Sequence, residues 1–480
     1  MHATDTLDRL LPELQPARQI PINRIDSDSR RLPSGALFFA LDTRHGAAAH
    51  FLPAAWQAGA AAAIVEGDSE GFTEGDTGPI WTRPDARELL GLALRRYHGW
   101  DSDANPRLIG VTGTNGKSSV TRLIAQLAPA SAQIIGTLGY GPVAALQPLP
   151  NTTPEAVELW RLLVAAREAE AQTVSMEVSS HALALGRVAA IPFRVAVFTN
   201  LSQDHLDFHG DMTSYGAAKA RLFTVPELRY AVLNADDAFS AELRRKIAAP
   251  VQVLSYGFGS GDIAVREYHP GASGTLLELQ TPQGKRRVRS PLLGRSNTYN
   301  LLAALATASA LGWEITDEQI AQLSLPAGRY QCLPAVPKKG RVMIDYAHTP
   351  DALERVLEDL RAIAKGKITI VFGCGGDRDR SKRPQMGAIA ARLADRVIVT
   401  DDNPRFEDPE QISADILAGI PTGGAVLEHD RARAIQLAIA EAEIGDWVLI
   451  AGKGHENYQD NRGQKRPFDD ACHAQEALRQ

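Results

Sequence analysis

The feature that most constrains the fold is a glycine-rich segment between an apolar run and a helical run. Residues 110–119 read GVTGTNGKSS. Glycines let the backbone turn tightly, so that its N–H groups point at phosphate oxygens, and the start of the next helix adds partial positive charge. Lys117 would reach the outer phosphates and the Ser118 hydroxyl would hold Mg²⁺. The segment predicts a nucleotide-binding loop, although Val111 stands where the strict pattern has glycine, and an ordinary glycine-rich turn is the alternative.

Short apolar runs alternate with helical runs along most of the chain, which predicts an α/β fold with mostly parallel sheets and helices on both faces. At about 150 residues per domain, 480 residues correspond to roughly three domains. We expect a small α/β domain over residues 1–100, a central domain over 101–326 and a third domain over 327–480. A polar stretch at 101–107 is the expected linker, and a turn near residues 326–328 ends the central domain.

Composition excludes several classes of protein. The formal charge of −6 argues against a protein that grips nucleic acid through its overall charge. The N-terminal residues lack the pattern of a secretory signal, and no apolar run approaches the roughly 18–20 residues that cross a bilayer. Three scattered cysteines, Cys332, Cys374 and Cys472, form no disulfide framework. We therefore expect a cytoplasmic protein without a transmembrane segment.

Three further features are candidate metal ligands. Glu177 ends an apolar strand, and its carboxylate could bind Mg²⁺, although a surface or cap residue is the more common case for such a glutamate. The polar cluster at 200–209, which includes His205, follows another strand, and a structural histidine is its alternative. Lys219 lies in a short helix for which Thr213 is the expected N-cap. From this segment alone, an exposed helical lysine is the expected interpretation.

Ordered motifs along nearly the whole chain resemble those of the Mur ligase family. They are DSR at 28–30, GTNGKSS at 113–119, NTTP at 151–154, EVSSHAL at 177–183, TNLSQDHLDFHGDM at 199–212, AAKARLF at 217–223, DYAHTPDAL at 345–353, GCGGDRDRSKRP at 373–384, DDNPR at 401–405 and GKGHE at 452–456. Within that family the chain is similar to the members that add meso-diaminopimelate to UDP-MurNAc-L-Ala-D-Glu.

The resemblance implies an N-terminal domain for the UDP sugar, a central P-loop-type ATPase and a C-terminal Rossmann-like domain that binds the amino acid. It implies that CO₂ converts Lys219 into a carbamate (N6-carboxylysine), which binds a second Mg²⁺ with His205, while Ser118 and Glu177 match a first Mg²⁺ site. Lys117, Glu177, His205 and Lys219 are then the catalytic residues. The implied ATP contacts are Gly113, Thr114, Asn115, Gly116, Lys117, Ser118, Ser119, Asn297, Asn300, Arg329, Asp345 and His348.

The resemblance also implies the reaction and the contacts to its two other substrates. ATP would activate the γ-carboxylate of D-Glu as an acyl phosphate, and the amine of the incoming amino acid would displace phosphate. Implied contacts to the UDP-sugar dipeptide are Ser27, Ser29, Asn151, Thr152, Thr153, Ser179 and Arg187. Implied contacts to diaminopimelate are Arg378, Asp402, Asn403, Pro404, Arg405, Gly452 and Glu456. The chain departs from some members at Leu185 and around Arg44-His45-Gly46, which affects particular sugar contacts.

Arg405 carries the expected choice of amino acid. Diaminopimelate differs from lysine by a distal carboxylate, and a guanidinium fork matches that group with two parallel hydrogen bonds. Family members that add lysine lack this arginine, and a surface turn residue is the alternative role. We weigh three other functions: a lysine-adding ligase, a folylpolyglutamate synthetase-like ligase and a nucleotide-binding regulator without activity. The expected partners are small-molecule substrates only, and the expected state is a monomer.

Overall fold

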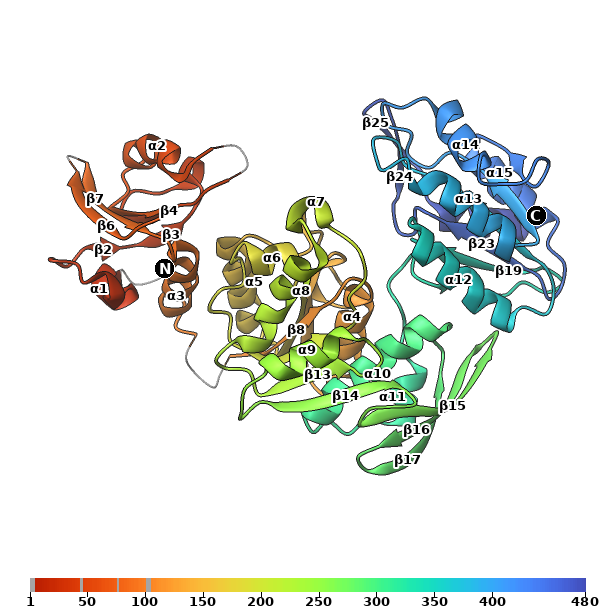
Figure 1. The fold of residues 1–480 in the computed structure, drawn as a ribbon, viewed down its shortest axis with the longest axis horizontal. Coiled ribbons are helices and arrows are strands. Elements are labelled where there is room, and N and C mark those ends of the chain that lie inside the picture. The colour runs from red at the N-terminus through yellow and green to blue at the C-terminus, as the bar shows by residue number, and fades with distance from the viewer. Residues whose placement is uncertain (1–4, 44–45, 76, 101–104) are drawn as a thin grey trace. The chain divides into compact units, whose positions relative to one another are not determined.

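The computed structural model describes residues 5–43, 46–75, 77–100 and 105–480 (Figure 1). Its contacts group the chain into two compact units. The first unit comprises residues 1–264 and 301–315, and the second comprises residues 265–300 and 316–480. Among the described residues, no helix is both long and apolar enough to span a membrane. The three-domain division expected from the sequence stays a prediction.

The first unit begins with a small sheet in the order β3-β4-β5-β7-β6. Its strands are β3 (Arg24–Asp26), β4 (Ala36–Ala40), β5 (Ala62–Glu66), β7 (Gly78–Arg83) and β6 (Gly71–Gly75), of which only β6 runs antiparallel to its neighbour. Successive strand residues point to opposite faces, so Phe38 and Phe39 enter two different cores. The other elements are β1 (Asp5–Thr6), α1 (Leu7–Leu10), β2 (Pro21–Ile22), α2 (Leu52–Gln57) and α3 (Ala86–Tyr97).

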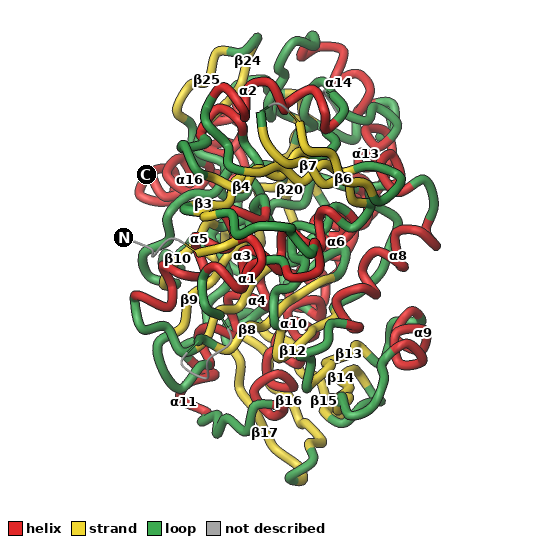
Figure 2. The backbone as a smooth tube through the Cα atoms, turned by 90° about the vertical axis from the view of Figure 1, so that its left-hand side faces the viewer, coloured by secondary structure: helices red, strands yellow, loops and turns green. Residues whose placement is uncertain are grey.

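A larger sheet of the first unit contains the order β10-β9-β11-β8-β12-β13-β14, flanked by helices (Figure 1, Figure 2). Its strands are β8 (Arg107–Thr112), β9 (Ala132–Gly136), β10 (Gly139–Pro142), β11 (Thr173–Glu177), β12 (Phe193–Phe198), β13 (Tyr230–Asn234) and β14 (Gln252–Phe258). Only β10 is antiparallel. Every residue of β11 is buried, as expected for a parallel strand covered on both faces.

The helices of this region are α4 (Lys117–Leu127), α5 (Ala156–Glu168), α6 (Ser180–Ala184), α7 (Leu206–His209), α8 (Met212–Ala220) and α9 (Phe239–Lys246). One expectation about them is wrong. The N-cap of α8 is Asp211, whose side chain accepts a hydrogen bond from the backbone N–H of Ser214, so Thr213 is already inside the helix. A carboxylate two residues earlier satisfies the same end of the helix.

The second unit contains an antiparallel pair and a second parallel sheet. The pair is β16 (Gly274–Thr281) and β17 (Gly284–Ser290), and β15 (Ile263–Gly271) precedes it. The sheet has the order β18-β19-β23-β20-β21-β22, in which only β18 is antiparallel. Its strands are β18 (Gln331–Cys332), β19 (Arg341–Asp345), β20 (Ile368–Phe372), β21 (Arg396–Val399), β22 (Val426–Leu427) and β23 (Trp447–Ala451).

Helices cover the second sheet, and its strands end along one edge. The helices of this part are α12 (Pro350–Ile363), α13 (Lys382–Leu393), α14 (Pro409–Leu417), α15 (Arg431–Ala440) and α16 (Asp470–Arg479). α11 (Asp317–Ala321) packs against β17, and α10 (Arg295–Ala310) begins in the second unit and continues in the first. Met343 packs on one face of the sheet and Val342 on the other. The register pairs Asp345 with Ala451 and Phe372 with Val399, so the loops after these strands gather where ligands bind in open α/β sheets. A hairpin of β24 (Tyr458–Asn461) and β25 (Gln464–Pro467) follows.

These observations confirm the predicted fold class, an α/β protein with mostly parallel sheets. The apolar, strand-like runs of the sequence at 133–139, 173–180, 194–201 and 230–236 overlap β9, β11, β12 and β13. The part that the sequence did not reveal is β15 and the antiparallel β16–β17 pair.

Candidate active site

The glycine-rich loop joins β8 to α4 and is fixed by the end of β12. Thr114 N–H donates to the carbonyl of Asn200 at 2.8 Å, and Asn115 N–H donates to Asn200 Oδ1 at 2.9 Å. Thr199 Oγ1 donates to the carbonyl of Asn115 at 2.6 Å. Gly113 has a φ of 150°, and a Cβ there would overlap Thr199 Oγ1, so no larger residue fits. The backbone of the loop is therefore held in place by these contacts, directly before the first turn of α4.

Lys117, the first residue of α4, folds over this loop. Its Nζ donates to the carbonyls of Gly113 and Thr114, at 2.9 Å in each case. The ammonium group thus lies at the loop, where the sequence predicts contact with the outer phosphates of a nucleotide.

Glu177 ends β11 beside this loop, and only 2% of it is exposed. Ser118 Oγ donates to its Oε2 at 2.9 Å, and Thr137 N–H donates to its Oε1 at 2.8 Å. Burial raises the pKa of the Glu177 carboxyl, against the opposing effect of Lys117. A Cβ on Gly136 would overlap Oε1, so the carboxylate occupies a space that only glycine leaves. The surface-residue interpretation of Glu177 does not fit this burial.

The oxygen atoms of Ser118 and Glu177 fit a Mg²⁺ ion. Mg²⁺ prefers oxygen ligands and is usually held by one or two protein groups together with phosphates and water. Among the described residues there is no cluster of three or more His, Cys, Asp or Glu side chains that could hold a metal alone. The pair therefore suits a cation that arrives with a nucleotide, and not a metal held by the protein alone.

Lys219 lies on the buried side of α8 and is not an exposed lysine. Its exposed fraction is 1%, and its Nζ lies 4.3 Å from the centre of the Tyr215 ring. Burial and the nearby Lys117 hold the pKa of the Lys219 amine well below its ordinary value. The Tyr215 hydroxyl lies 3.2 Å from Thr114 Oγ1, so this tyrosine joins the helix to the glycine-rich loop.

His205 also lies near Tyr215. Their ring centres are 6.2 Å apart, and the His205 ring is 4.9 Å from that of His181. Burial and the neighbouring histidines lower the pKa of His181 to about 4. Tyr215 therefore lies between three parts of the site: the glycine-rich loop, Lys219 and His205. Tyr215 and His181 are not among the site residues predicted from the sequence, although His181 stands in the EVSSHAL motif.

The residues matched to the UDP-sugar dipeptide fall into two places in the first unit. Thr153 Oγ1 donates to the carbonyl of Glu177 at 2.9 Å, Ser179 N–H donates to Thr153 Oγ1 at 3.1 Å, and Arg187 Nη1 donates to the carbonyl of Thr153 at 3.3 Å. Thr152 Oγ1 lies 2.9 Å from Thr137 Oγ1. These four residues therefore lie around the end of β11, next to Glu177.

The other residues of this predicted set lie apart or cannot be placed. Ser27 and Ser29 follow β3, where Asp26 and Asp28 accept backbone hydrogen bonds. Asn151 is exposed in the loop before Thr152. Arg44 and His45 lie outside the described residues.

In the second unit, three residues matched to ATP gather around Tyr346. The Arg329 guanidinium lies 4.7 Å from the Tyr346 ring centre, and His348 Nδ1 lies 2.8 Å from the Tyr346 carbonyl. Asp345 is buried and accepts the N–H of Tyr330 at 2.8 Å, and burial raises the pKa of its carboxyl. The two asparagines matched to ATP are on α10, where Asn300 Nδ2 donates to Asn297 Oδ1 at 3.0 Å.

The residues matched to diaminopimelate meet where β20, β21 and β23 end. Arg405 has a φ of 52°, and its Nη1 donates to the carbonyl of Gly376 at 2.6 Å. Asn403 Nδ2 donates to Glu456 Oε2 at 2.7 Å. A Cβ on Gly452 would lie 2.6 Å from Asp402 Oδ2, so this glycine leaves room for that carboxylate.

Arg378 and Pro404 complete the predicted set at the same edge. Arg378 Nη1 lies 3.4 Å from the carbonyl of Asp377, and a Cβ on Gly376 would overlap the carbonyl of Pro404. Lys453 is wholly buried among these residues and is not among those predicted from the sequence. Its position directly after an apolar strand was the available signal.

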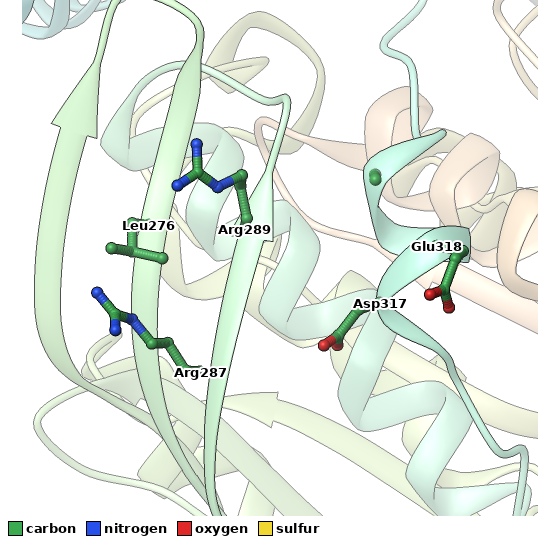
Figure 3. A pocket seen from close by; sticks show the side chains of 6 residues that line it. Leu276, Arg287, Arg289, Asp317 and Glu318 are labelled. Carbon is green, nitrogen blue, oxygen red and sulfur yellow. The ribbon is translucent and has the colours of Figure 1, made fainter.

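A surface groove lies elsewhere in the second unit, between the β16–β17 pair and α11 (Figure 3). Its volume is about 540 Å³, and Arg287 and Arg289 on the strand side face Asp317 and Glu318 on the helix side. None of the residues predicted from the sequence lines it. Charged side chains on an edge strand such as β17 also prevent pairing with other chains.

Comparison with known proteins gives consistent matches. Residues 111–308 match the Mur ligase middle domain, and residues 328–454 match the Mur ligase glutamate ligase domain. The UDP-N-acetylmuramoyl-L-alanyl-D-glutamate–2,6-diaminopimelate ligase of Chromobacterium violaceum is 43% identical, over 98% of this chain and 97% of its own length. A solved structure of a ligase with that name is 36% identical with a TM-score of 0.78 and covers 99% of both chains.

A folylpolyglutamate synthase of Mycobacterium tuberculosis is similar in fold alone. It is 20% identical with a TM-score of 0.61, over 76% of this chain and 92% of its own.

Proposed function

The chain belongs to the Mur ligase family, as the sequence motifs predicted, and we propose that it joins meso-2,6-diaminopimelate to UDP-MurNAc-L-Ala-D-Glu. The reaction is an ATP-dependent amide ligation in cytoplasmic peptidoglycan precursor synthesis. The observation that carries this proposal is the group at the end of the second parallel sheet, where Arg405, Asn403 and Glu456 lie together. Full-length similarity to ligases that are named for this reaction supports it.

The proposed roles of the parts follow the order of the chain. Residues 1–100 bind the UDP sugar through Ser27 and Ser29, residues 101–326 bind ATP, and residues 327–480 bind the amino acid. The dipeptide end of the acceptor contacts Asn151, Thr152, Thr153, Ser179 and Arg187, which supports a position for its γ-carboxylate near the phosphate loop. The remaining contacts to ATP come from Asn297, Asn300, Arg329, Asp345 and His348.

The first chemical step joins two anions. An oxygen of the D-Glu γ-carboxylate attacks the γ-phosphorus of ATP. The bond between that phosphorus and the oxygen of the β-phosphate breaks, so ADP is released and the carboxylate becomes an acyl phosphate. The repulsion between carboxylate and triphosphate must be offset by positive charge. Lys117 supplies it from the protein, and the N–H groups of the loop around Gly113 and Gly116 bind phosphate oxygens.

Mg²⁺ is the proposed cofactor. Ser118 and Glu177 would hold one ion, and His205 and a carbamate of Lys219 would hold a second. When bound, these ions neutralise charge on the phosphates and on the acyl phosphate. The low pKa of the buried Lys219 amine supports carbamate formation, because only a neutral amine can attack the carbon of CO₂ and then lose a proton.

In the second step the amine of diaminopimelate attacks the acyl carbon. A tetrahedral intermediate forms and expels phosphate, and the nitrogen loses a proton. Arg405 holds the distal carboxylate of the amino acid, and Glu456 pairs with an ammonium group. The lysine-adding alternative is disfavoured because lysine has no second carboxylate for Arg405 to bind.

The direct test is product formation by the purified protein. The protein is incubated with ATP, Mg²⁺, UDP-MurNAc-L-Ala-D-Glu and meso-diaminopimelate, and products are identified by mass spectrometry. The expected result is a UDP-MurNAc-tripeptide together with one ADP per product. Absence of that tripeptide while a parallel reaction with another amino acid proceeds would refute the proposal.

A further inference from the structure

Lys453 is a buried cation with no assigned role, directly after β23. Its exposed fraction is 0%, and its Nζ donates to Asn403 Oδ1 at 3.1 Å. The same Nζ lies 3.4 Å from Glu456 Oε2 and 3.9 Å from Asp402 Oδ1. A lysine is rarely buried unless it is paired, because removing a charge from water is costly. Its three partners are all residues of the proposed diaminopimelate site.

The hydrogen bonds define the orientation of the Asn403 amide. An ammonium group can only donate, so the amide oxygen must face Lys453. That oxygen also accepts the N–H of Asp460 at 2.9 Å. The amide nitrogen is then directed at Glu456 Oε2, to which it donates at 2.7 Å. Lys453 and the Asp460 N–H together determine which side of Asn403 reaches the glutamate.

The same contacts leave one oxygen of Glu456 available. Oε2 accepts hydrogen bonds from Lys453 Nζ and Asn403 Nδ2, whereas Oε1 accepts no hydrogen bond from any residue in the described part of the chain. The Glu456 side chain is 22% exposed, so a ligand can reach it. A carboxylate with one oxygen fixed and the other open is arranged to accept a hydrogen bond from an ammonium group.

Lys453 also balances the charge at this site. Asp402 and Glu456 are two acids close together, and Asp402 is buried. Without a cation between them, their repulsion would move one carboxylate or favour its protonated form. We propose that Lys453 is a positioning residue for the amino acid substrate: it fixes Asn403 and Glu456 so that Glu456 Oε1 receives an ammonium group of diaminopimelate. This inference rests on the proposed function.

The test compares Lys453→Met with a matched loss of charge. Lys465→Met is the control, because Lys465 is exposed on β25 and lies over the same Tyr458 ring as Lys453, at 4.3 Å and 5.7 Å respectively. Lys453→Met should raise KM for diaminopimelate by about tenfold or more, because it leaves buried polar groups without a partner. KM for ATP and for the UDP-sugar dipeptide should not change, and Lys465→Met should behave as the parent.

A double variant separates positioning from a general structural role. If Lys453 acts through Glu456, then Lys453→Met combined with Glu456→Gln should raise KM for diaminopimelate no more than Glu456→Gln alone. Lys453→Gln keeps an N–H₂ donor group without the charge, and it serves as the second variant if the methionine variant does not fold. It should raise the same KM selectively.

Three results would overturn the inference: an unchanged KM for diaminopimelate, an equal rise in KM for ATP, or additive effects in the double variant. If the parent enzyme ligates diaminopimelate and the variants match it, only the role of Lys453 is wrong. If the parent ligates no diaminopimelate, the proposed function fails, and the role of Lys453 fails with it.

Discussion

Arg405→Ala tests the proposed recognition of the amino acid. The backbone of Arg405 is fixed by its neighbours, since its N–H donates to the carbonyl of Asp460 at 3.0 Å and its carbonyl accepts the N–H of Arg462 at 2.7 Å. Its φ of 52° strains alanine as much as arginine, so the substitution changes only the side chain. Among the described residues, the guanidinium has one hydrogen bond, from Nη1 to Gly376, which leaves Nε and Nη2 as a fork for a carboxylate.

The expected loss follows from this geometry. Removing one partner of a buried charged pair costs about 2–5 kcal/mol. Arg405 is only partly buried, so we use the lower part of that range, about 2–3 kcal/mol. At about 1.4 kcal/mol per factor of ten, kcat/KM for diaminopimelate should fall about 30- to 150-fold. Arg405→Lys keeps the charge but loses the fork, so it should recover only part of that loss.

The assay is the initial rate of ADP release at varied diaminopimelate and saturating ATP. Arg462→Ala is the matched control, because Arg462 is an exposed neighbour with the same φ of 52° and no role in the proposal. A kcat/KM for Arg405→Ala within threefold of the parent, or an equal loss in Arg462→Ala, would refute the reasoning.

Three further predictions concern the rest of the molecule. Gly136→Ala should lower the ligation rate about a hundredfold, because the new methyl group displaces Glu177. The rate of ADP release would measure this loss, and circular dichroism would show that the variant is still folded. Lys219→Ala should lose most activity and regain part of it with added formate or acetate, which replace the carbamate; mass spectrometry of the parent should detect bound CO₂. Asp470→Asn should lower the free energy of unfolding by about 3 kcal/mol, because it breaks the wholly buried pair with Arg431, as urea denaturation would measure.

Each of these predictions has a control or a result that would contradict it. Gly71→Ala is the control for Gly136, since a Cβ there meets nothing nearer than 3.8 Å, and equal losses in both would exclude displacement of Glu177. Full activity of Lys219→Ala without added acid would refute the carbamate. Asp351→Asn removes an exposed pair with Arg355, which should cost less than about 1 kcal/mol. An equal cost in Asp470→Asn would contradict the role of burial.

The sequence predicted the parallel sheets well because their strands carry a strong signal. β23 (WVLIA) is apolar along its whole length and β12 (FRVAVF) at every position but one, and polar residues follow each strand. Glu177 ends β11, Ser118 lies in the first turn of the helix after β8 and Asn403 follows β21, so their positions near strand ends could be predicted without the structure.

Other parts could not be predicted from local pattern. β17 reads GKRRVRS, and a strand with four basic residues does not resemble a strand by composition. The burial of Lys219 and Lys453 depends on groups that are distant in sequence, such as Asn403, which is 50 residues from Lys453. Only the folded chain shows that these lysines have lost their contact with water.

One measurement tests the central claim most directly. The protein receives ATP, UDP-MurNAc-L-Ala-D-Glu and an equimolar mixture of meso-diaminopimelate and L-lysine, and the UDP-linked products are separated by mass. The account predicts that nearly all product carries diaminopimelate in the parent and that Arg405→Ala reduces this preference. A product that carries lysine as often as diaminopimelate, or a preference that survives the loss of Arg405, would contradict it.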